Sequence, residues 1–105
     1  IFQPHLYTRT RDFYKEFADS LSLLDEVILV DIYPAREQPI PGVTSQLIYD
    51  NLRPGIEKCM CRKEDILNLL SQKKIEVLIT LGAGDIDNYV PEITKQLKLR
   101  MRNEE

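Results

Sequence analysis

Several residue types that build active sites are scarce in this sequence. Its 105 residues include one histidine, two cysteines and no tryptophan. A zinc site needs about four His, Cys or carboxylate ligands, and His5 lies far along the chain from Cys59 and Cys61. Because a second histidine and a plausible nucleophile–base pair are also lacking, we assign no catalytic residue and no metal ligand from the sequence.

The two cysteines are separated by a single residue. In a strand, Cys59 and Cys61 would point to the same face, which is a poor geometry for a mutual disulfide. We favour two small reduced residues in or near the core. Reduced thiols are typical of a cytoplasmic protein, and we expect that localisation.

Long apolar runs and a strong excess of either charge are also missing. No run approaches the ~18 apolar residues that span a membrane, and no signal-peptide pattern is present. The net charge of −3 at pH 7 argues against nucleic acid or a membrane surface as a partner. With 43% hydrophobic and 30% charged residues, the chain is typical of one soluble globular domain.

Short apolar runs alternate with helical periodicity along the chain. Strands are predicted where apolar and β-branched residues cluster, and helices where apolar residues recur at spacings of three and four. The predicted strands cover 1–4, 26–33, 58–61 and 75–81. The predicted helices cover 10–23, a segment from Thr44 or Ser45 to about Arg53, 66–70, and 86–97 with Pro91 inside. This alternation predicts an α/β fold with a mainly parallel sheet and helices on both faces.

Three loops with unusual composition follow the predicted strands. They read "HLYTRTR", "YPAREQPIPG" and "GAGDID", whereas "RKED" after the third strand is typical of an ordinary solvated helix start. In open parallel sheets, ligands bind beyond the carboxyl ends of the strands. We therefore expect these three loops to share one edge of the sheet and to form the ligand side.

The first loop places basic side chains where a helix begins. His5, Arg9 and Arg11 lie near the helix N-terminus, where the macrodipole already presents about half a positive charge. A bound phosphate or carboxylate would offset this repulsion. Alternatively, the arginines point into water or pair with a nearby acidic side chain, which could be Asp12, Glu16 or Glu37.

The other two loops allow more than one interpretation. Arg36 and Glu37, in the proline-rich second loop, suit either recognition or a purely structural role. The third loop begins like a dinucleotide-binding turn, but Asp87 stands where G-x-G-x-x-G requires glycine. We interpret Gly82 and Gly84 as allowing a tight turn and the close approach of a neighbouring domain or substrate. A Walker-type phosphate loop is absent from the sequence.

Three segments in the order of the sequence resemble one known family. They are "FQPHLYTRTRDFYKEFADSL", "VDIYPAREQPIPGVTS" and "LGAGDI", and together they are similar to the C-terminal domain of the Mur ligases from Phe2 to about Leu97. The resemblance implies a Rossmann-like three-layer fold. It also implies that residues 1–105 form the greater part of that domain. The first segment of the domain, the N-terminal UDP-sugar domain and the central ATPase domain would lie outside, and a start at Ile1 is expected of a domain cut from a longer protein.

The same resemblance implies an activity for the whole protein. It would be an ATP-dependent amide ligase that joins L-alanine to UDP-N-acetylmuramate through an acyl phosphate, in peptidoglycan biosynthesis. ATP and Mg²⁺ would serve the full-length enzyme, and we expect the 105 residues alone to bind neither and to be inactive. The alternative is a non-catalytic flavodoxin-like module that binds a phosphorylated small molecule.

The resemblance also implies functional residues. Those expected to bind substrate are His5, Tyr7, Thr8, Arg9 and Thr10. Those expected at the surface facing the other domains and the substrate are Tyr33, Arg36, Gly82, Gly84 and Asp85. Where the family commonly has arginine, this chain has Leu6, so a contact from that arginine is missing.

Overall fold

The computed structural model describes the main chain of residues 1–104 and the side chains of residues 1–100. Within this part, the α-helices are α1 (Tyr7–Leu21), α2 (Gln46–Asp50), α3 (Ile66–Ser71) and α4 (Val90–Glu104). The 3₁₀ helices are η1 (Lys63–Asp65) and η2 (Asp85–Tyr89), and the strands are β1 (Glu26–Leu29) and β2 (Glu57–Met60). The predicted α/β class is therefore confirmed.

A small parallel sheet forms the centre of the chain. β1 and β2 pair in parallel, with Val27 opposite Lys58. Residues 1–3 extend the ladder on the other side of β1, because the Phe2 amide donates to the Ile28 carbonyl at 2.8 Å and the Val30 amide donates to the Phe2 carbonyl at 3.1 Å. The first residues of the chain thus lie beside β1 and parallel to it.

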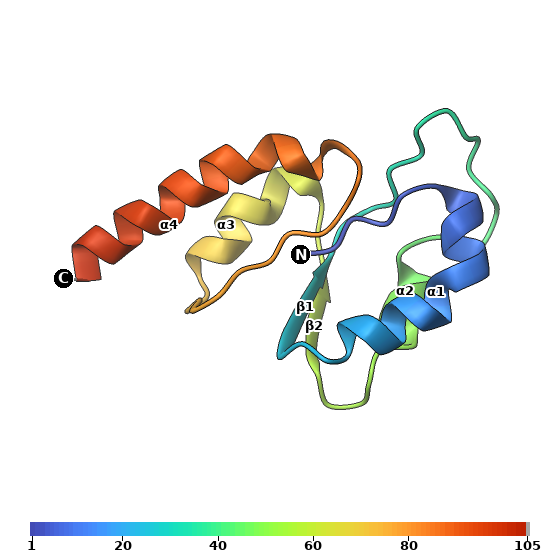
Figure 1. The fold of residues 1–105 in the computed structure, drawn as a ribbon, viewed down its shortest axis with the longest axis horizontal. Helices are drawn as coiled ribbons and strands as arrows, with labels where there is room; N and C mark the ends of the chain where they lie inside the picture. The colour runs from blue at the N-terminus through green and yellow to red at the C-terminus, as the bar shows by residue number, and fades with distance from the viewer. Residues whose placement is uncertain (105) are drawn as a thin grey trace.

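The segment predicted as the fourth strand joins this ladder only at its end. The Leu81 amide donates to the Ile1 carbonyl at 2.8 Å, and the Gln3 amide donates to the Leu81 carbonyl at 2.9 Å. Parallel segments therefore lie in the order 79–81, 1–3, β1, β2. Figure 1 shows the amino terminus beside the extended segment that leads to η2.

Two strand predictions need correction. Residues 75–81 are not a regular strand, because their bonds to residues 1–3 begin only at Ile79, and Val77 is 80% exposed. The strand predicted over 26–33 ends at Leu29 and resumes only as an isolated bridge at Tyr33. In both segments the apolar composition indicated burial. A strand also requires main-chain hydrogen bonds to a neighbouring segment, which recur at every second residue.

Buried side chains of β1 alternate between two apolar clusters, as the pleat of a strand requires. One cluster contains Ile28 and Val30 with residues of α3, η2 and α4: Ile66, Leu70, Ile86 and Ile93. The other contains Val27 and Leu29 with residues of α1, of α2 and of the segment after it: Ala18, Leu21, Ile48, Leu52 and Ile56. Figure 1 shows α3 and α4 on one side of the two strands and α1 and α2 on the other.

Several helix boundaries differ from those expected. α2 ends at Asp50, before the predicted end near Arg53, and α4 continues to Glu104, beyond the predicted end at residue 97. α1 begins at Tyr7, three residues before the predicted start, because its first turn is stabilised by contacts described below. The last predicted helix is divided into η2 and α4, with Pro91 in the first turn of α4. A proline is tolerated there because the first amides of a helix have no intrahelical partner.

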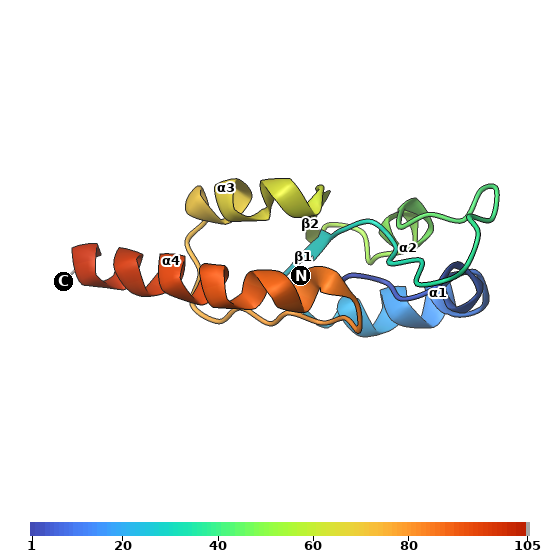
Figure 2. The same cartoon turned by 90° about the horizontal axis from the view of Figure 1, so that it is seen from above.

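The molecule is elongated along α4, with principal extents of 47 × 32 × 17 Å. Figure 2 shows α4 running past the end of α3. No helix in the described part of the chain combines the length and apolar character needed to cross a membrane.

We expect Ile48→Ala to destabilise the 105-residue chain by about 2–5 kcal/mol, because it opens a cavity beneath α1 and α2. Ile48 is 0% exposed, whereas Leu23 is 88% exposed. Leu23→Ala, the matched control, should change the free energy of unfolding by less than about 0.5 kcal/mol. Urea unfolding followed by circular dichroism measures both variants, and equal effects would contradict the described packing.

Candidate functional site

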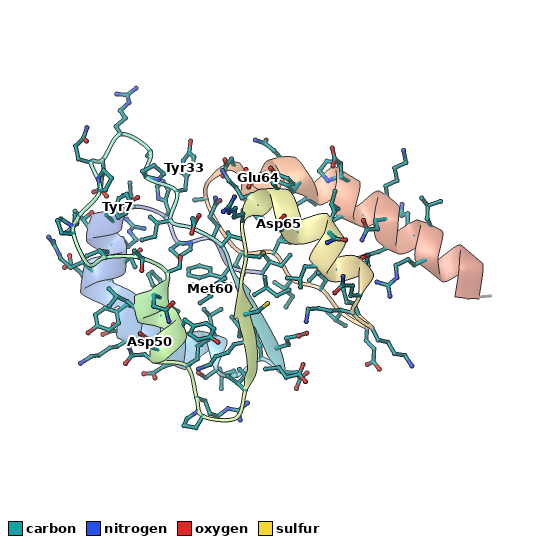
Figure 3. The ribbon with its side chains drawn as sticks, turned by 180° about the vertical axis from the view of Figure 1, so that it is seen from behind. Tyr7, Tyr33, Asp50, Met60, Glu64 and Asp65 are labelled. Atoms are coloured by element: carbon teal, nitrogen blue, oxygen red, sulfur yellow. The ribbon has the colours of Figure 1, made fainter. Side chains whose placement is uncertain are left out.

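Residues predicted from two different loops meet at the edge toward which the parallel segments point. The Tyr33 amide donates to the Pro4 carbonyl at 2.8 Å, and the Leu6 amide donates to the Tyr33 carbonyl at 2.9 Å. The His5 and Tyr33 rings are stacked, with centroids 5.9 Å apart and planes 16° apart. Figure 3 shows Tyr7 and Tyr33 along this edge, with Glu64 of η1 labelled beside them.

The glycines of the third loop touch these same residues. A Cβ atom at Gly84 would lie 2.4 Å from Cγ of Tyr33 and 2.8 Å from Oε1 of Gln3. A Cβ atom at Gly82 would lie 2.9 Å from Cγ2 of Ile86. The two glycines therefore allow close contacts within this chain, and the approach of a neighbouring domain or substrate stays a prediction.

A buried glutamine connects the third loop to the centre of the sheet. Gln3 is 1% exposed. Its Nε2 donates to Oδ1 of Asp85 at 2.6 Å, and its Oε1 accepts the Ile86 amide at 3.0 Å. The other carboxylate oxygen of Asp85 accepts from Nζ of Lys63, at the start of η1. Both ends of the Gln3 amide are thus used, and the loop after β2 joins the edge through Lys63.

The carboxylate of Asp85 is held in its charged form. Partial burial alone would raise its pKa, but the hydrogen bonds from Lys63 and Gln3 outweigh that effect and lower the pKa below its ordinary value. The same ion pair raises the pKa of Lys63. Gln3 and Lys63 were not among the predicted site residues. A polar Gln3 in the first apolar segment was the available signal, whereas nothing in "RKED" distinguished Lys63 from a solvated lysine.

The N-terminus of α1 already has an anion, which is Glu37 from the second loop. The Thr8 amide donates to one Glu37 carboxylate oxygen at 3.1 Å, and the Thr8 hydroxyl donates to the other at 2.5 Å. Hydrogen bonds from the Thr8 hydroxyl and main chain, with the nearby Arg11 charge, lower the pKa of Glu37 despite partial desolvation. The helix dipole and Arg11 therefore face a carboxylate supplied by the chain itself.

A tight turn brings Glu37 to this position. The Glu37 amide donates to the Pro34 carbonyl at 2.9 Å, and Ala35 between them has a φ of +53°. A non-glycine residue in this region is strained and persists only when its surroundings hold it. The turn of the "YPARE" segment therefore has a visible structural role, which is to return a carboxylate to α1.

The predicted arginines have different environments. Arg11 forms an ion pair with Asp12 at 2.9 Å, one of the acidic partners considered from the sequence. Arg9 and Arg36 are exposed, and no ion pair joins either to any residue within the described side chains. Arg9 follows Tyr7 and Thr8 in the first turn of α1, so its charge is available to solvent at the predicted edge.

Thr10, a predicted substrate contact, is fully buried. Its hydroxyl donates to the Leu6 carbonyl at 2.9 Å, and its amide donates to the same oxygen at 3.2 Å. Leu6 has a φ of +70°, which costs a non-glycine residue about 1–3 kcal/mol. Thr10 thus holds the strained residue from which α1 begins, and its side chain does not reach the surface.

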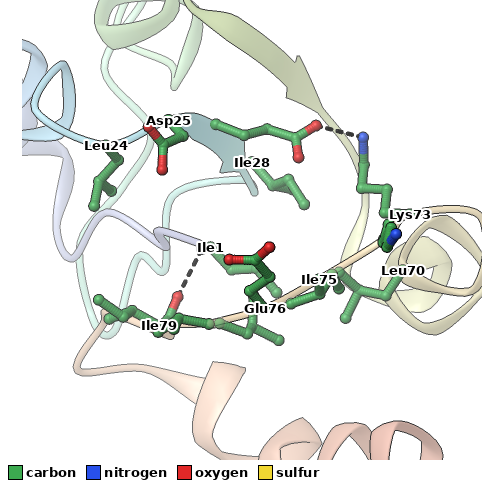
Figure 4. Close-up of a pocket in the computed structure, with 13 residues that line it drawn as sticks. Ile1, Leu24, Asp25, Ile28, Leu70, Lys73, Ile75, Glu76 and Ile79 are labelled. Atoms are coloured by element: carbon green, nitrogen blue, oxygen red, sulfur yellow. Dashed lines mark hydrogen bonds and ion pairs between the residues drawn. The ribbon is translucent and has the colours of Figure 1, made fainter. Parts of the chain in front are cut away.

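A cavity of about 650 Å³ opens far from this edge, near the amino end of β1. None of the predicted site residues lines it. Lys73 donates to Glu26 at 2.6 Å and the Ile1 amino group donates to the Ile79 carbonyl at 2.8 Å, as Figure 4 shows. Among the described residues, no group of three or more His, Cys, Asp or Glu side chains could hold a metal ion.

Comparison of the sequence with curated proteins identifies relatives of this chain. The chain is 87% identical over 93 residues to a curated protein from Phocaeicola vulgatus named UDP-N-acetylmuramate–L-alanine ligase, a match that covers 89% of this chain and 20% of that protein. The chain belongs to the family of these ligases. No protein-family model matches the chain.

Other ligases of this name show the same pattern. The protein from Parabacteroides distasonis is 54% identical over 102 residues, with 97% of this chain and 22% of that protein covered. The protein from Cytophaga hutchinsonii is 52% identical over 93 residues, with 89% of this chain and 20% of that protein covered. The chain therefore spans about a fifth of the length of the curated ligases that it matches.

We expect Glu37→Gln to lower the thermal midpoint of the 105-residue chain at pH 7, because it removes the charge and one acceptor at the start of α1. The pKa of Glu37 is lowered on folding, so its ionised form stabilises the chain above the ordinary pKa of a glutamate and this contribution disappears as pH falls. The difference between wild type and variant should therefore shrink between pH 7 and pH 3. Melting curves of both proteins, with exposed Glu16→Gln as the control, measure it, and a difference independent of pH would contradict this role.

Proposed function

We propose that this chain is part of an ATP-dependent ligase that joins L-alanine to UDP-N-acetylmuramate during peptidoglycan biosynthesis in the cytoplasm. The observation that supports this most strongly is the 87% identity, over 93 residues, to a curated protein of that name. Since the chain spans about a fifth of that protein, the complete reaction belongs to the full-length polypeptide.

We assign residues 1–105 to the greater part of the C-terminal domain of that ligase, with a Rossmann-like three-layer fold. The order 79–81, 1–3, β1, β2 supports this fold. Numbered along the chain and listed from β2 to 79–81, it is the order 3-2-1-4 with which the strand order of doubly wound sheets begins. The apolar clusters on both faces of β1, with helices in each, are consistent with the same arrangement.

In this fold the substrate edge lies where the strand order reverses, between residues 1–4 and 79–81. His5 and the Gly82–Asp85 loop follow those two segments directly. We propose that the exposed guanidinium of Arg9 attracts a substrate carboxylate or phosphate. His5, Tyr7 and Thr8 would border that position, while Thr10 holds the turn beneath them.

The remaining predicted residues shape the surface that faces the other domains. Tyr33 packs over Gly84, and Asp85 is fixed by Gln3 and Lys63. Arg36 is exposed on the second loop and would meet the neighbouring domain or the substrate that it holds. Closure of this domain would then place the amino acid and the acyl phosphate side by side, which reduces the entropic cost of their reaction.

ATP and Mg²⁺ would be held outside these residues. The sequence contains no Walker-type loop, and the described side chains offer no cluster that fits a metal ion. We propose that the central domain of the full-length ligase binds both, and that this segment contributes the closing surface. When bound, they would supply activation of the muramyl carboxylate.

The full-length polypeptide that includes this segment should release phosphate from ATP only when L-alanine and UDP-N-acetylmuramate are both present. The isolated 105-residue chain should fold, as judged by circular dichroism, and show no ATP turnover. A coupled phosphate-release assay measures both proteins. Turnover by the isolated chain would contradict this division of labour, and an inactive full-length protein that binds a phosphorylated small molecule would favour the binding-module alternative.

Arg9→Ala in the full-length ligase should raise the KM for L-alanine or lower kcat by about 10-fold to 150-fold, because a charge-assisted hydrogen bond is worth roughly 1.5–3 kcal/mol. The thermal midpoint should change little, since Arg9 is exposed. Lys15→Ala removes another exposed cation of α1 and is the matched control. Wild-type kinetics for Arg9→Ala would leave this arginine as a solvated surface residue.

A further inference from the structure

Gln3 differs from the other polar side chains of the edge because it is buried in the ladder yet points its amide at a loop. It is 1% exposed, and its main chain pairs with Leu81 on one side. Its side chain accepts from the Ile86 amide at 3.0 Å and donates to Asp85 at 2.6 Å. A buried amide with both ends satisfied fixes the groups that it bonds, because any displacement leaves a buried polar atom without a partner.

The contacts of Gln3 connect the loops that form the edge. Through Asp85 it reaches Lys63, which lies in the loop after β2. A Cβ atom placed at Gly84 would lie 2.8 Å from Oε1 of Gln3 and 2.7 Å from Cβ of Tyr33. The side chain of Gln3 is therefore in contact with the third loop, and the same loop packs against Tyr33, whose ring stacks on His5.

We propose that Gln3 is a positioning residue of the ligase reaction, which sets the relative placement of the His5–Tyr33 pair, the Gly82–Asp85 loop and Lys63. This role rests on the proposed function. Gln3 does not touch substrate; it acts through Asp85, Ile86 and Gly84. An amide is required at this position because one end must accept from an amide hydrogen while the other donates to a carboxylate.

Gln3→Leu keeps a similar volume but loses both hydrogen bonds, so the loop would shift relative to the ladder. In the full-length ligase, kcat/KM for L-alanine should fall by about 10-fold to 100-fold, the range associated with misplacing reacting groups by about 1 Å. The matched control is Gln96→Leu, which removes the bond of 2.9 Å from Gln96 in α4 to the Leu67 carbonyl in α3. That variant should lose stability without an equivalent loss of activity at a temperature where both variants are folded.

A second pair of variants separates positioning from folding. Gln3→Glu places a carboxylate against Asp85 and should lower kcat/KM as strongly as Gln3→Leu. Gln3→Glu combined with Asp85→Asn restores a donor–acceptor pair between the two side chains and still accepts from the Ile86 amide. Because Asp85→Asn also removes the ion pair with Lys63, kcat/KM should rise several-fold above that of Gln3→Glu without reaching the wild-type value. If Gln3→Leu does not fold, the comparison of Gln3→Glu with this double variant decides the question.

The outcomes are distinguishable. If the wild type is active and kcat/KM of Gln3→Leu lies within threefold of the wild-type value, the positioning role is overturned and the proposed function stands. The same conclusion follows if kcat/KM of the double variant is no higher than that of Gln3→Glu. An inactive wild type would overturn the proposed function and this role with it. We expect kcat/KM to recover partly in the double variant, and we expect the Gln3 variants to have unfolding midpoints similar to that of Gln96→Leu.

Discussion

The hydrogen-bond ladder around residues 1–3 is the constraint on which the rest of the structure depends. These residues pair with β1 on one side and with Ile79 and Leu81 on the other. Because all of these segments are parallel, their carboxyl ends lie at one edge, and every loop that leaves them begins there. The packing of helices on both faces of β1 follows from this central position, since side chains alternate across the ladder.

Electrostatic balance at that edge is largely achieved within the chain. Glu37 occupies the N-terminus of α1, Asp12 pairs with Arg11, and Lys63 pairs with Asp85. Basic residues at the start of a helix are therefore tolerated without a bound ligand. Of the two arginines of the first loop that the sequence singled out, Arg9 is the exception, because it is exposed and no ion pair joins it to any of the described side chains. Within the first loop, recognition of an anionic substrate would thus depend on Arg9 alone rather than on a basic patch.

Periodicity and composition predicted the α/β class, the burial of β1 on both faces and the meeting of loops at one edge. They could not predict contacts that depend on loop conformation. Glu37 reaches α1 only because a strained turn at Ala35 redirects the chain, and no local pattern encodes a contact between residues 8 and 37. The apolar segment 75–81 indicated a strand, yet composition reports burial preference and not the presence of a pairing partner. Gln3 was overlooked because a single polar residue in a short apolar stretch is ambiguous without its neighbours.

The contact between Gly84 and Tyr33 has a consequence for how this surface can change over evolutionary time. Positions 3, 33 and 84 share one small volume, in which even a methyl group at 84 would overlap atoms of the other two. A larger residue at 84 therefore requires a change at both other positions, because Cβ of Tyr33 at 2.7 Å and Oε1 of Gln3 at 2.8 Å both stand in the way of its Cβ atom. The three positions, which are distant in sequence, form one steric unit whose members must be exchanged in concert. Exposed positions of the second loop such as Gln38 can change independently, whereas positions 3, 33 and 84 can change only together.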